Sequence, residues 1–439
     1  DSEAVFYQGC YANQVEKIRG ELPKVKVWIQ LEDSTPLLEG SHAYSDVVQN
    51  TAPMPRIERN EDNIYMLYTG GTTGMPKGVM YTHGGFVNSM LKTLKGMGVD
   101  VPDELADIKD TILNLHENGE LAKSFVACPL MHGTGMWLGG FLSHLLGGCV
   151  VTTPNLGLDT QLLWKEVERV GITNIIIVGD SFAKPMVKEL DRAVAENKPY
   201  NLETLKLIYS SGVMFSADVK ASLLDHHDMV LMDAMGSSEG GMGSSVSTRA
   251  DGAATAKFRL NPGVVVVSDE GEEVIPGSGV RGLIGTSGLV PEGYYKDKEK
   301  SDATFKEFNG TRYSFPGDYA LVEADGTITL LGRGSNCINS AGEKIYPEEV
   351  EEALKLNSNV YDSLVVGLPD ERFGNKVVGV VSLAENCEID EAELISSTRE
   401  HLSGYKLPKS IIFVSEVMRA PNGKADYKWA KKVAEAELI

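Results

Sequence analysis

The middle of the chain alternates between continuous apolar runs and segments in which apolar residues recur at helical spacing. The apolar runs predict strands at Ile172–Val178, Leu205–Tyr209 and Met229–Ala234. Helical spacing is clearest at Leu162, Leu163, Val167 and Val170, and further helices are predicted to begin near Pro185 and Ser216. Continuous apolar strands separated by helices are typical of a parallel sheet covered on both faces. This region is therefore predicted to be α/β, with a doubly wound sheet.

Two neighbouring regions show other patterns. Before the α/β region, short strands are predicted at Ile64–Tyr68 and Gly78–Tyr81, with a helix from about Gly85. After it, residues 252–331 show short apolar runs punctuated by Gly, Pro and Asp, without helical periodicity. Such punctuation favours strands and tight turns. A small β-rich subdomain is therefore expected at about 252–331.

The C-terminal part changes pattern once more. Pro347 is expected to open a helix whose first turns carry Glu348, Glu349, Glu351 and Glu352, where acids complement the helix dipole. Strands at Val360–Gly367, Lys376–Leu383 and Ile411–Val414 and a helix at Glu391–Leu402 complete an α+β unit. The predicted organisation is a large domain at 1–332, a hinge at 333–335 and a mobile C-terminal lid domain at 336–439.

Composition and charge limit the classes of function. The chain has 439 residues, 42% of them hydrophobic and 23% charged, which fits a globular protein with two or three domains. No apolar run approaches the roughly 20 residues that a membrane helix needs. The net charge of −21 argues against nucleic acid and against an integral or anionic membrane partner. Five scattered cysteines show no disulfide or zinc spacing, which favours reduced thiols and a cytoplasmic location.

A loop rich in glycine and threonine between the two early strands carries the strongest chemical signal. It consists of Thr69, Gly70, Gly71, Thr72, Thr73 and Gly74, and Lys77 follows. Glycines allow backbone N–H groups to approach a polyphosphate, the threonines add hydroxyl donors, and the lysine adds charge. The loop is not a Walker A motif, because Lys77 follows Pro76 and no Ser or Thr comes next.

This loop resembles the phosphate loop of the adenylate-forming superfamily, which includes acyl-CoA synthetases, peptide-synthetase adenylation domains and beetle luciferases. Further segments resemble the landmarks of that family in the expected order. These segments are Asp233–Glu239, Pro316–Asp318, Gly332–Arg333, Ser340–Lys344, Pro347–Glu351 and Pro421–Lys424. The resemblance covers essentially the whole chain, and the variant sequence around Gly332–Asn339 is most similar to fatty-acyl and sterol-side-chain CoA ligases.

The resemblance assigns roles to the residues of the nucleotide site. Adenine is expected beside Gly212, Ala234, Met235, Gly236, Ser237 and Ser238. Glu239 would bind Mg²⁺ and Lys424 would be the catalytic lysine. Asp318 and Arg333 would bind the ribose, since a carboxylate accepts hydrogen bonds from two hydroxyls and a guanidinium donates in a rigid fork. Taken alone, Asp318 would be a turn residue and Arg333 a surface cation.

The acyl site and the CoA channel are also assigned by resemblance. The acyl pocket is expected to contain His132, Gly133, Trp137, Val213 and Met214, with adaptable methionines at positions 131, 136, 214, 232 and 235. His132 is equally compatible with a core histidine. Ser340, Ala341, Gly342 and Glu343 would line the channel for the pantetheine arm of CoA, and Ser335 would lie in the hinge.

The chain departs from the family pattern in four places. Met235 replaces an aromatic residue, which weakens stacking on adenine, and Pro316 replaces a threonine in the ribose turn. Ser335 lies where the family commonly has Asp or Lys at the hinge. The stretch before the phosphate loop is short and opens at Asp1 directly into a strand-like segment, so part of the large domain is expected to be missing.

The resemblance implies an ATP-dependent acid–thiol ligase. A carboxylic acid, expected to be a fatty or bulky apolar acid of lipid metabolism, would react with ATP to give acyl-AMP and pyrophosphate, and CoA would then give acyl-CoA and AMP. Mg²⁺ is the expected cofactor, and a homodimer is an open alternative for the assembly. Two other functions stay open: an acyl-AMP ligase that loads a carrier protein, and a non-catalytic acyl- or nucleotide-binding module.

Overall fold

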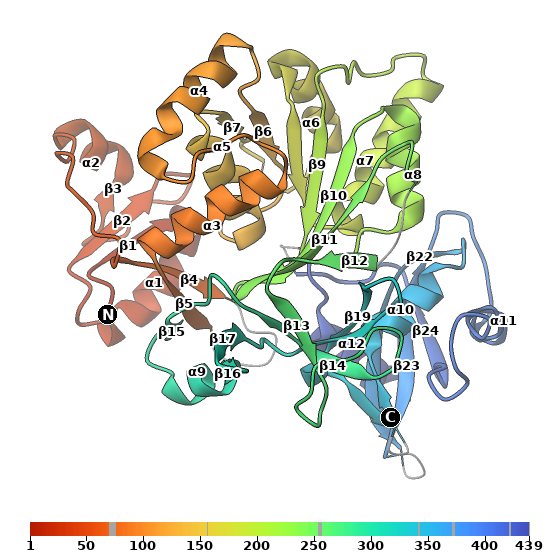
Figure 1. Ribbon diagram of the computed structural model, residues 1–439. Coiled ribbons are helices and arrows are strands. Elements are labelled where there is room, and N and C mark those ends of the chain that lie inside the picture. The colour runs from red at the N-terminus through yellow and green to blue at the C-terminus, as the bar shows by residue number, and fades with distance from the viewer. Residues whose placement is uncertain are drawn as a thin grey trace. The chain divides into compact units, whose positions relative to one another are not determined.

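Two compact units, Asp1–Arg59 and Asn60–Ile439, make up the computed structural model shown in Figure 1. The structure describes residues 1–69, 76–155, 157–252, 257–340, 343–370, 374–420 and 423–438. The first unit is a three-stranded parallel sheet with two short helices: β1 (Ala4–Gln8), β2 (Val27–Leu31), β3 (His42–Ala43), α1 (Ala12–Ile18) and α2 (Tyr44–Asn50). Tyr7, Val15 and Trp28 form its small core.

The main sheet of the second unit has a parallel half, as the apolar runs predict. Its strands, in spatial order, are β7 (Cys149–Val151), β6 (Lys123–Val126), β8 (Asn174–Ile177), β9 (Leu207–Ser211) and β10 (Val230–Ser237). The helices in this region are α3 (His83–Gly96), α4 (Ile108–Glu117), α5 (Leu142–Leu145), α6 (Thr160–Glu166), α7 (Asp180–Ala195) and α8 (Ala217–His226). Ile175, Ile208 and Leu231 are fully buried in its core. Burial on both faces explains why these strands are apolar throughout.

Most of the short strands of the β-rich segment extend the same sheet. β10 turns back into β11 (Gly240–Ser247), so the sheet continues in antiparallel pairing to 13 strands within the described residues. The added strands are β12 (Lys257–Leu260), β13 (Val264–Val267), β14 (Arg281–Thr286), β16 (Phe305–Phe308), β17 (Thr311–Ser314), β18 (Asp318–Val322) and β19 (Thr327–Arg333). Strands β12, β13, β14, β18 and β19 share a separate core around Phe258, Ile284 and Ile328. The β-rich segment thus has its own core but no sheet of its own.

A small separate sheet supports the predicted phosphate loop. β4 (Ile64–Thr69) and β5 (Lys77–Thr82) form an antiparallel pair, and β15 (Gly293–Tyr294) pairs with β5 on its other side. Helix α9 (Lys298–Thr304) follows β15. Residues 70–75, which connect β4 to β5, lie outside the described residues.

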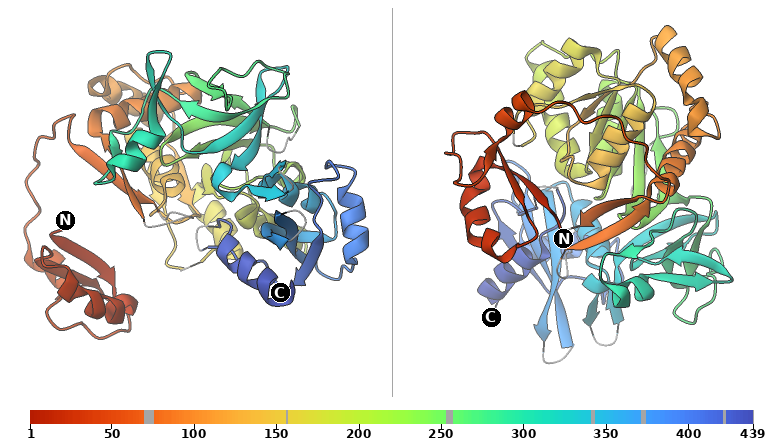
Figure 2. Two further views of the ribbon diagram at one scale, coloured as in Figure 1. Left: turned by 90° about the horizontal axis from the view of Figure 1, so that it is seen from below. Right: turned by 90° about the vertical axis from the view of Figure 1, so that its left-hand side faces the viewer.

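The C-terminal elements form a compact α+β arrangement, coloured blue in Figure 2. They are β20 (Ile338–Ser340), β21 (Glu343–Ile345), α10 (Pro347–Lys355), β22 (Val360–Asp370), β23 (Gly374–Leu383), α11 (Glu391–Thr398), β24 (Ser410–Val414) and α12 (Tyr427–Leu438). Alternate residues of β22 point to opposite faces, so that Val365 joins a core with α10 whereas Val366 joins another with α12. Burial of both faces accounts for the continuous apolar run.

Several elements differ from the predicted ones. Helix α7 begins at Asp180 rather than near Pro185, because its N-cap residue Gly179 has a positive φ of 55° that turns the chain into the helix. Helix α11 ends at Thr398, whereas the apolar pattern predicts a helix to Leu402. Helices α4 and α12 were not predicted. Within the described residues, no helix is both long and apolar enough to span a membrane.

Candidate active site

The β4–β5 hairpin presents the two ends of the predicted phosphate loop. Thr69 and Lys77 are paired opposite each other at the end of the hairpin. The Lys77 ammonium lies 4.7 Å from the centre of the Tyr294 ring, within the range of a cation–π contact. Gly70, Gly71, Thr72, Thr73 and Gly74 lie outside the described residues, so their role stays a prediction.

Glu239 is held at the turn between β10 and β11. Its side chain is 7% exposed, and its Oε1 accepts a hydrogen bond of 2.7 Å from the Tyr294 hydroxyl. Its backbone N–H donates to the Ser237 hydroxyl at 3.1 Å, and the Tyr81 hydroxyl donates to the Ser238 carbonyl at 2.7 Å. The neighbouring strands therefore fix both the turn and the carboxylate that it carries.

Asp318 and Arg333 face each other across the antiparallel pair β18–β19. Arg333 Nε lies 3.4 Å from Asp318 Oδ1, while Asp318 Oδ2 is buried without a hydrogen-bond partner within the described residues. Burial raises the pKa of Asp318, and the Arg333 charge opposes this shift. A buried oxygen without a donor is costly, and ribose hydroxyl groups would supply that donor.

The loop before α12 that contains Gly423 and Lys424, called the lysine loop below, places Lys424 against this site. A Cβ on Gly212, at the end of β9, would lie 3.8 Å from Lys424 Cε. The Lys424 side chain is in part exposed to solvent, yet desolvation lowers its pKa. The Arg333 charge lowers this pKa further. The carboxylates of Glu239 and Asp318 raise it and so oppose the shift. These charges act on one another because the structure brings Lys424 together with Arg333, Glu239 and Asp318.

The turn after β9 is held by the start of helix α7. Asp180 N–H donates to the Met214 carbonyl at 2.8 Å, and Asp180 Oδ1 accepts from Ser216 N–H at 2.9 Å. A Cβ on Gly179 would lie 2.1 Å from the Met214 carbonyl oxygen, so only glycine fits there. Gly212, Val213 and Met214 are thereby fixed beside the lysine loop.

His132 begins the segment predicted to line the acyl pocket, and a π-helix at Thr134–Phe141 follows it. Burial lowers the pKa of His132, and the Lys424 charge lowers it further. The Trp137 indole N–H donates to the Tyr65 hydroxyl at 3.1 Å, and the Trp137 ring also covers Gly133. His132 is therefore a partly buried residue whose pKa responds to the Lys424 charge, rather than a wholly internal histidine.

The five methionines of the predicted pocket do not form one cluster. Met131 is 72% exposed, Met235 is buried in the core of the antiparallel half, and Met232 packs against the core of the parallel half. Sequence spacing cannot separate these environments, because alternate residues of β10 point to opposite faces of the sheet. Ala234 is partly buried, whereas Gly236 is exposed at the bulge between β10 and β11.

The residues predicted for the hinge and the CoA channel are described only in part. The Ser335 backbone lies in a short 3₁₀ turn at Gly334–Asn336. Ser340 and Glu343 are paired at the end of the β20–β21 hairpin, and Ala341 and Gly342 lie outside the described residues. The predicted channel therefore stays a prediction.

Sequence reasoning missed the residues that support the site. Tyr81 and Tyr294 hold the Glu239 turn, and the Asp362 carboxylate binds Arg419 next to the lysine loop through two hydrogen bonds of 2.7 Å. No motif marks these residues. Their roles depend on strand pairing between distant segments, which one sequence does not reveal.

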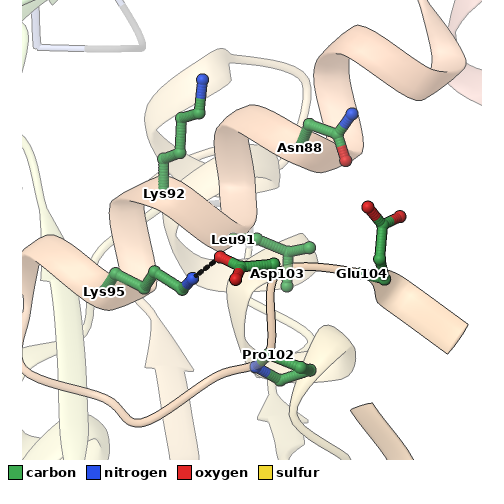
Figure 3. A pocket seen from close by; sticks show the side chains of 7 residues that line it. All are labelled: Asn88, Leu91, Lys92, Lys95, Pro102, Asp103 and Glu104. Atoms are coloured by element: carbon green, nitrogen blue, oxygen red, sulfur yellow. Dashed lines mark hydrogen bonds and ion pairs between the residues drawn. The ribbon is translucent and has the colours of Figure 1, made fainter. Parts of the chain in front are cut away.

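A surface pocket lies away from these residues, between helix α3 and residues 102–104 (Figure 3). Its volume is about 220 Å³, and Lys95 forms an ion pair there with Asp103. The described residues that line it include none of those predicted for the nucleotide, acyl or CoA sites. It is therefore distinct from the candidate active site.

The sequence also matches known families and proteins. The profile of the family described as AMP-binding enzyme matches residues 1–295, and that of the AMP-binding enzyme C-terminal domain matches residues 349–424. The 3-oxocholest-4-en-26-oate–CoA ligase of Rhodococcus rhodochrous is 40% identical over 98% of this chain and 78% of its own length. A medium/long-chain-fatty-acid–CoA/3-oxocholest-4-en-26-oate–CoA ligase of Mycolicibacterium smegmatis is 39% identical over 99% of this chain and 79% of its own length.

The fold also matches solved structures. The structure of the anthranilate CoA ligase AuaEII in complex with anthranoyl-AMP matches with a TM-score of 0.79 at 20% identity. The match covers 100% of this chain and 79% of that chain. The structure of ATP-bound MatB from Rhodopseudomonas palustris matches with a TM-score of 0.75 at 20% identity, over 100% of this chain and 80% of that chain. The chain belongs to the family of AMP-binding enzymes, and within it to the acyl-CoA ligases.

Asp318→Ala should weaken ATP binding by about 1.5–3 kcal/mol, because a hydrogen bond to a charged group is lost. Calorimetric titration with ATP measures the effect. Asp325→Ala is the control, since Asp325 is an exposed carboxylate that pairs with Lys257 at the start of β12. An unchanged ATP affinity in Asp318→Ala would remove this residue from the site.

Proposed function

We propose that this chain couples a fatty acid or a carboxylated sterol side chain to CoA through an acyl-AMP intermediate. The observation that carries the proposal is the position of Lys424 against Gly212, within electrostatic reach of Asp318, Glu239 and His132. A cation in this place answers the central difficulty of the reaction, which is the repulsion between a carboxylate and the α-phosphate. The relatives named above act on acids of this class.

In the first half-reaction, the carboxylate oxygen attacks the α-phosphorus of ATP and the bond to pyrophosphate breaks. Asp318 holds the ribose, Lys77 binds phosphate, and Lys424 stabilises the charge that develops between the reacting groups. In the second half-reaction, the CoA thiolate attacks the acyl carbon and the bond to AMP breaks. For this step we propose that residues 336–439 rotate about 333–335, which withdraws Lys424 and brings in the segment around Gly342.

Glu239 fits the requirements of a magnesium ligand. It offers a hard carboxylate oxygen at a turn that hydrogen bonds hold rigid, and Tyr294 occupies only its Oε1. Mg²⁺ commonly takes one or two carboxylates, with substrate phosphates and water completing its coordination. When bound, the ion would neutralise phosphate charge. We therefore propose Glu239 as its protein ligand.

A cytoplasmic location is also proposed. All five cysteines are free thiols, at positions 10, 128, 149, 337 and 387. Proteins with several unpaired cysteines are typical of reducing compartments, where thiols stay reduced.

A panel of acids tests the proposed substrate class. Pyrophosphate exchange into ATP should depend on fatty acids or sterol-side-chain acids, and acyl-CoA should form only when CoA is added. Exchange without acyl-CoA formation would favour a carrier protein as the acceptor. Nucleotide binding without exchange for any acid would favour a binding module.

Lys424→Ala should reduce adenylation by about 100-fold or more, because the charge that stabilises the transition state is lost. Formation of acyl-CoA from supplied acyl-AMP should change little, since the lysine acts only in the first half-reaction. The exposed Lys428 of α12 provides a matched control as Lys428→Ala. Equal losses in the two half-reactions would contradict the assignment.

A further inference from the structure

One helix of the large domain contacts the C-terminal part at three places. Near the start of α7, a Cβ on Gly423 would lie 2.6 Å from Ser181 Oγ, so this helix touches the lysine loop directly. One turn on, Lys184 donates a hydrogen bond to the Tyr361 carbonyl at the start of β22. After a further turn, Lys188 forms an ion pair of 2.5 Å with Glu385.

Lys184 binds the C-terminal part in two ways. Its ammonium donates to the Tyr361 carbonyl and also lies 5.0 Å from the centre of the Tyr361 ring. The side chain is partly buried, and desolvation lowers its pKa. Lys188, by contrast, is 71% exposed and its partner Glu385 is 79% exposed. Exposed pairs contribute little, so the Lys184 contact is the stronger of the two.

The residue next to Tyr361 connects this contact to the lysine loop. Asp362 accepts two hydrogen bonds of 2.7 Å from Arg419, and the pair is more than four-fifths buried. Arg419 in turn donates to the Gly423 carbonyl at 3.3 Å, directly before Lys424. A continuous set of polar contacts therefore runs from helix α7 to the residue that precedes the catalytic lysine.

A cavity of about 30 Å³ lies where these contacts meet. Charged groups from both sides line it: Asp180 and Lys184 from α7, and Lys355, Asp362 and Arg419 from the C-terminal part. The charges of the cations and the carboxylates offset one another where α7 meets the C-terminal part. Loss of one of these cations would leave the facing carbonyl and carboxylates with fewer partners, which is costly in a poorly solvated place.

We propose that Lys184 is a positioning residue that holds the C-terminal part in the arrangement used for adenylation. It fixes the start of β22, and the Asp362–Arg419 pair transmits that position to the lysine loop. This inference rests on the proposed function, because it assigns the contact to the first half-reaction alone. In the second half-reaction, the same contact has to break.

The two half-reactions test the assignment. Lys184→Met keeps the length of the side chain but removes the donor, and should slow adenylation by about tenfold or more. Thioester formation from supplied acyl-AMP should stay within about twofold of the unmodified enzyme. Lys184→Arg should restore most of the rate, because a guanidinium also donates. Lys188→Met is the matched control on the same helix and should change neither step, as expected for an exposed pair.

Cross-linking gives a readout that does not need catalysis. Cysteines at positions 188 and 385, with Cys10, Cys149, Cys337 and Cys387 replaced by serine, should react with a short bis-maleimide when α7 and the C-terminal part are in contact. Adding Lys184→Met to this variant should lower the yield severalfold. Thermal unfolding shows whether each variant is folded.

The outcomes separate this inference from the proposed function. An unmodified chain without adenylation activity for any acid would refute the function, whereas the cross-linking yield would still test the contact. A cross-linking yield unaffected by Lys184→Met would overturn the inference. It would also be overturned if both half-reactions slowed equally, or if Lys188→Met had the same effect as Lys184→Met.

Discussion

The candidate active site depends on charges that offset one another around a carboxylate largely removed from water. The Asp318 side chain is 14% exposed and Arg333 lies 3.4 Å from it, while the charges of Glu239 and Lys424 act on both. A buried charge is tolerated only with partners, and one cation of this group comes from the C-terminal part. The position of that part is therefore coupled to the electrostatics of the site, and through it to the chemistry that the site can perform.

Strand pairing makes this arrangement precise. Asp318 and Arg333 are opposite residues of two antiparallel strands, and Glu239 lies at a hairpin turn of the same sheet. The second, smaller sheet supplies Lys77 on β5 and Tyr294 on β15. Groups on paired strands have little freedom to move, so the residues of the predicted nucleotide site are held in place without a substrate. In the proposed function, the change of arrangement between the half-reactions is assigned to the C-terminal part.

Many of the strands and the candidate site residues could be predicted from the sequence, because short local segments indicate them. The apolar runs predict the parallel strands, and Glu239, Asp318, Arg333 and Lys424 follow from ordered motifs. Features that depend on long-range pairing could not be predicted. Examples are the joining of the β-rich strands to the main sheet, the hydrogen bond from Tyr294 to Glu239, and the contact of Lys184 with β22. The burial of Met235 could not be predicted either, since it depends on which face of β10 the side chain occupies.

The central claim is that the acid is activated as an adenylate before it reaches CoA. Transfer of oxygen from acid to nucleotide tests this most directly. With a fatty acid labelled with ¹⁸O in its carboxylate, mass spectrometry of the AMP formed should find one ¹⁸O atom in its phosphate, because the attacking carboxylate oxygen stays on phosphorus when the acyl group leaves. Unlabelled AMP, or labelled orthophosphate formed together with ADP, would contradict the account.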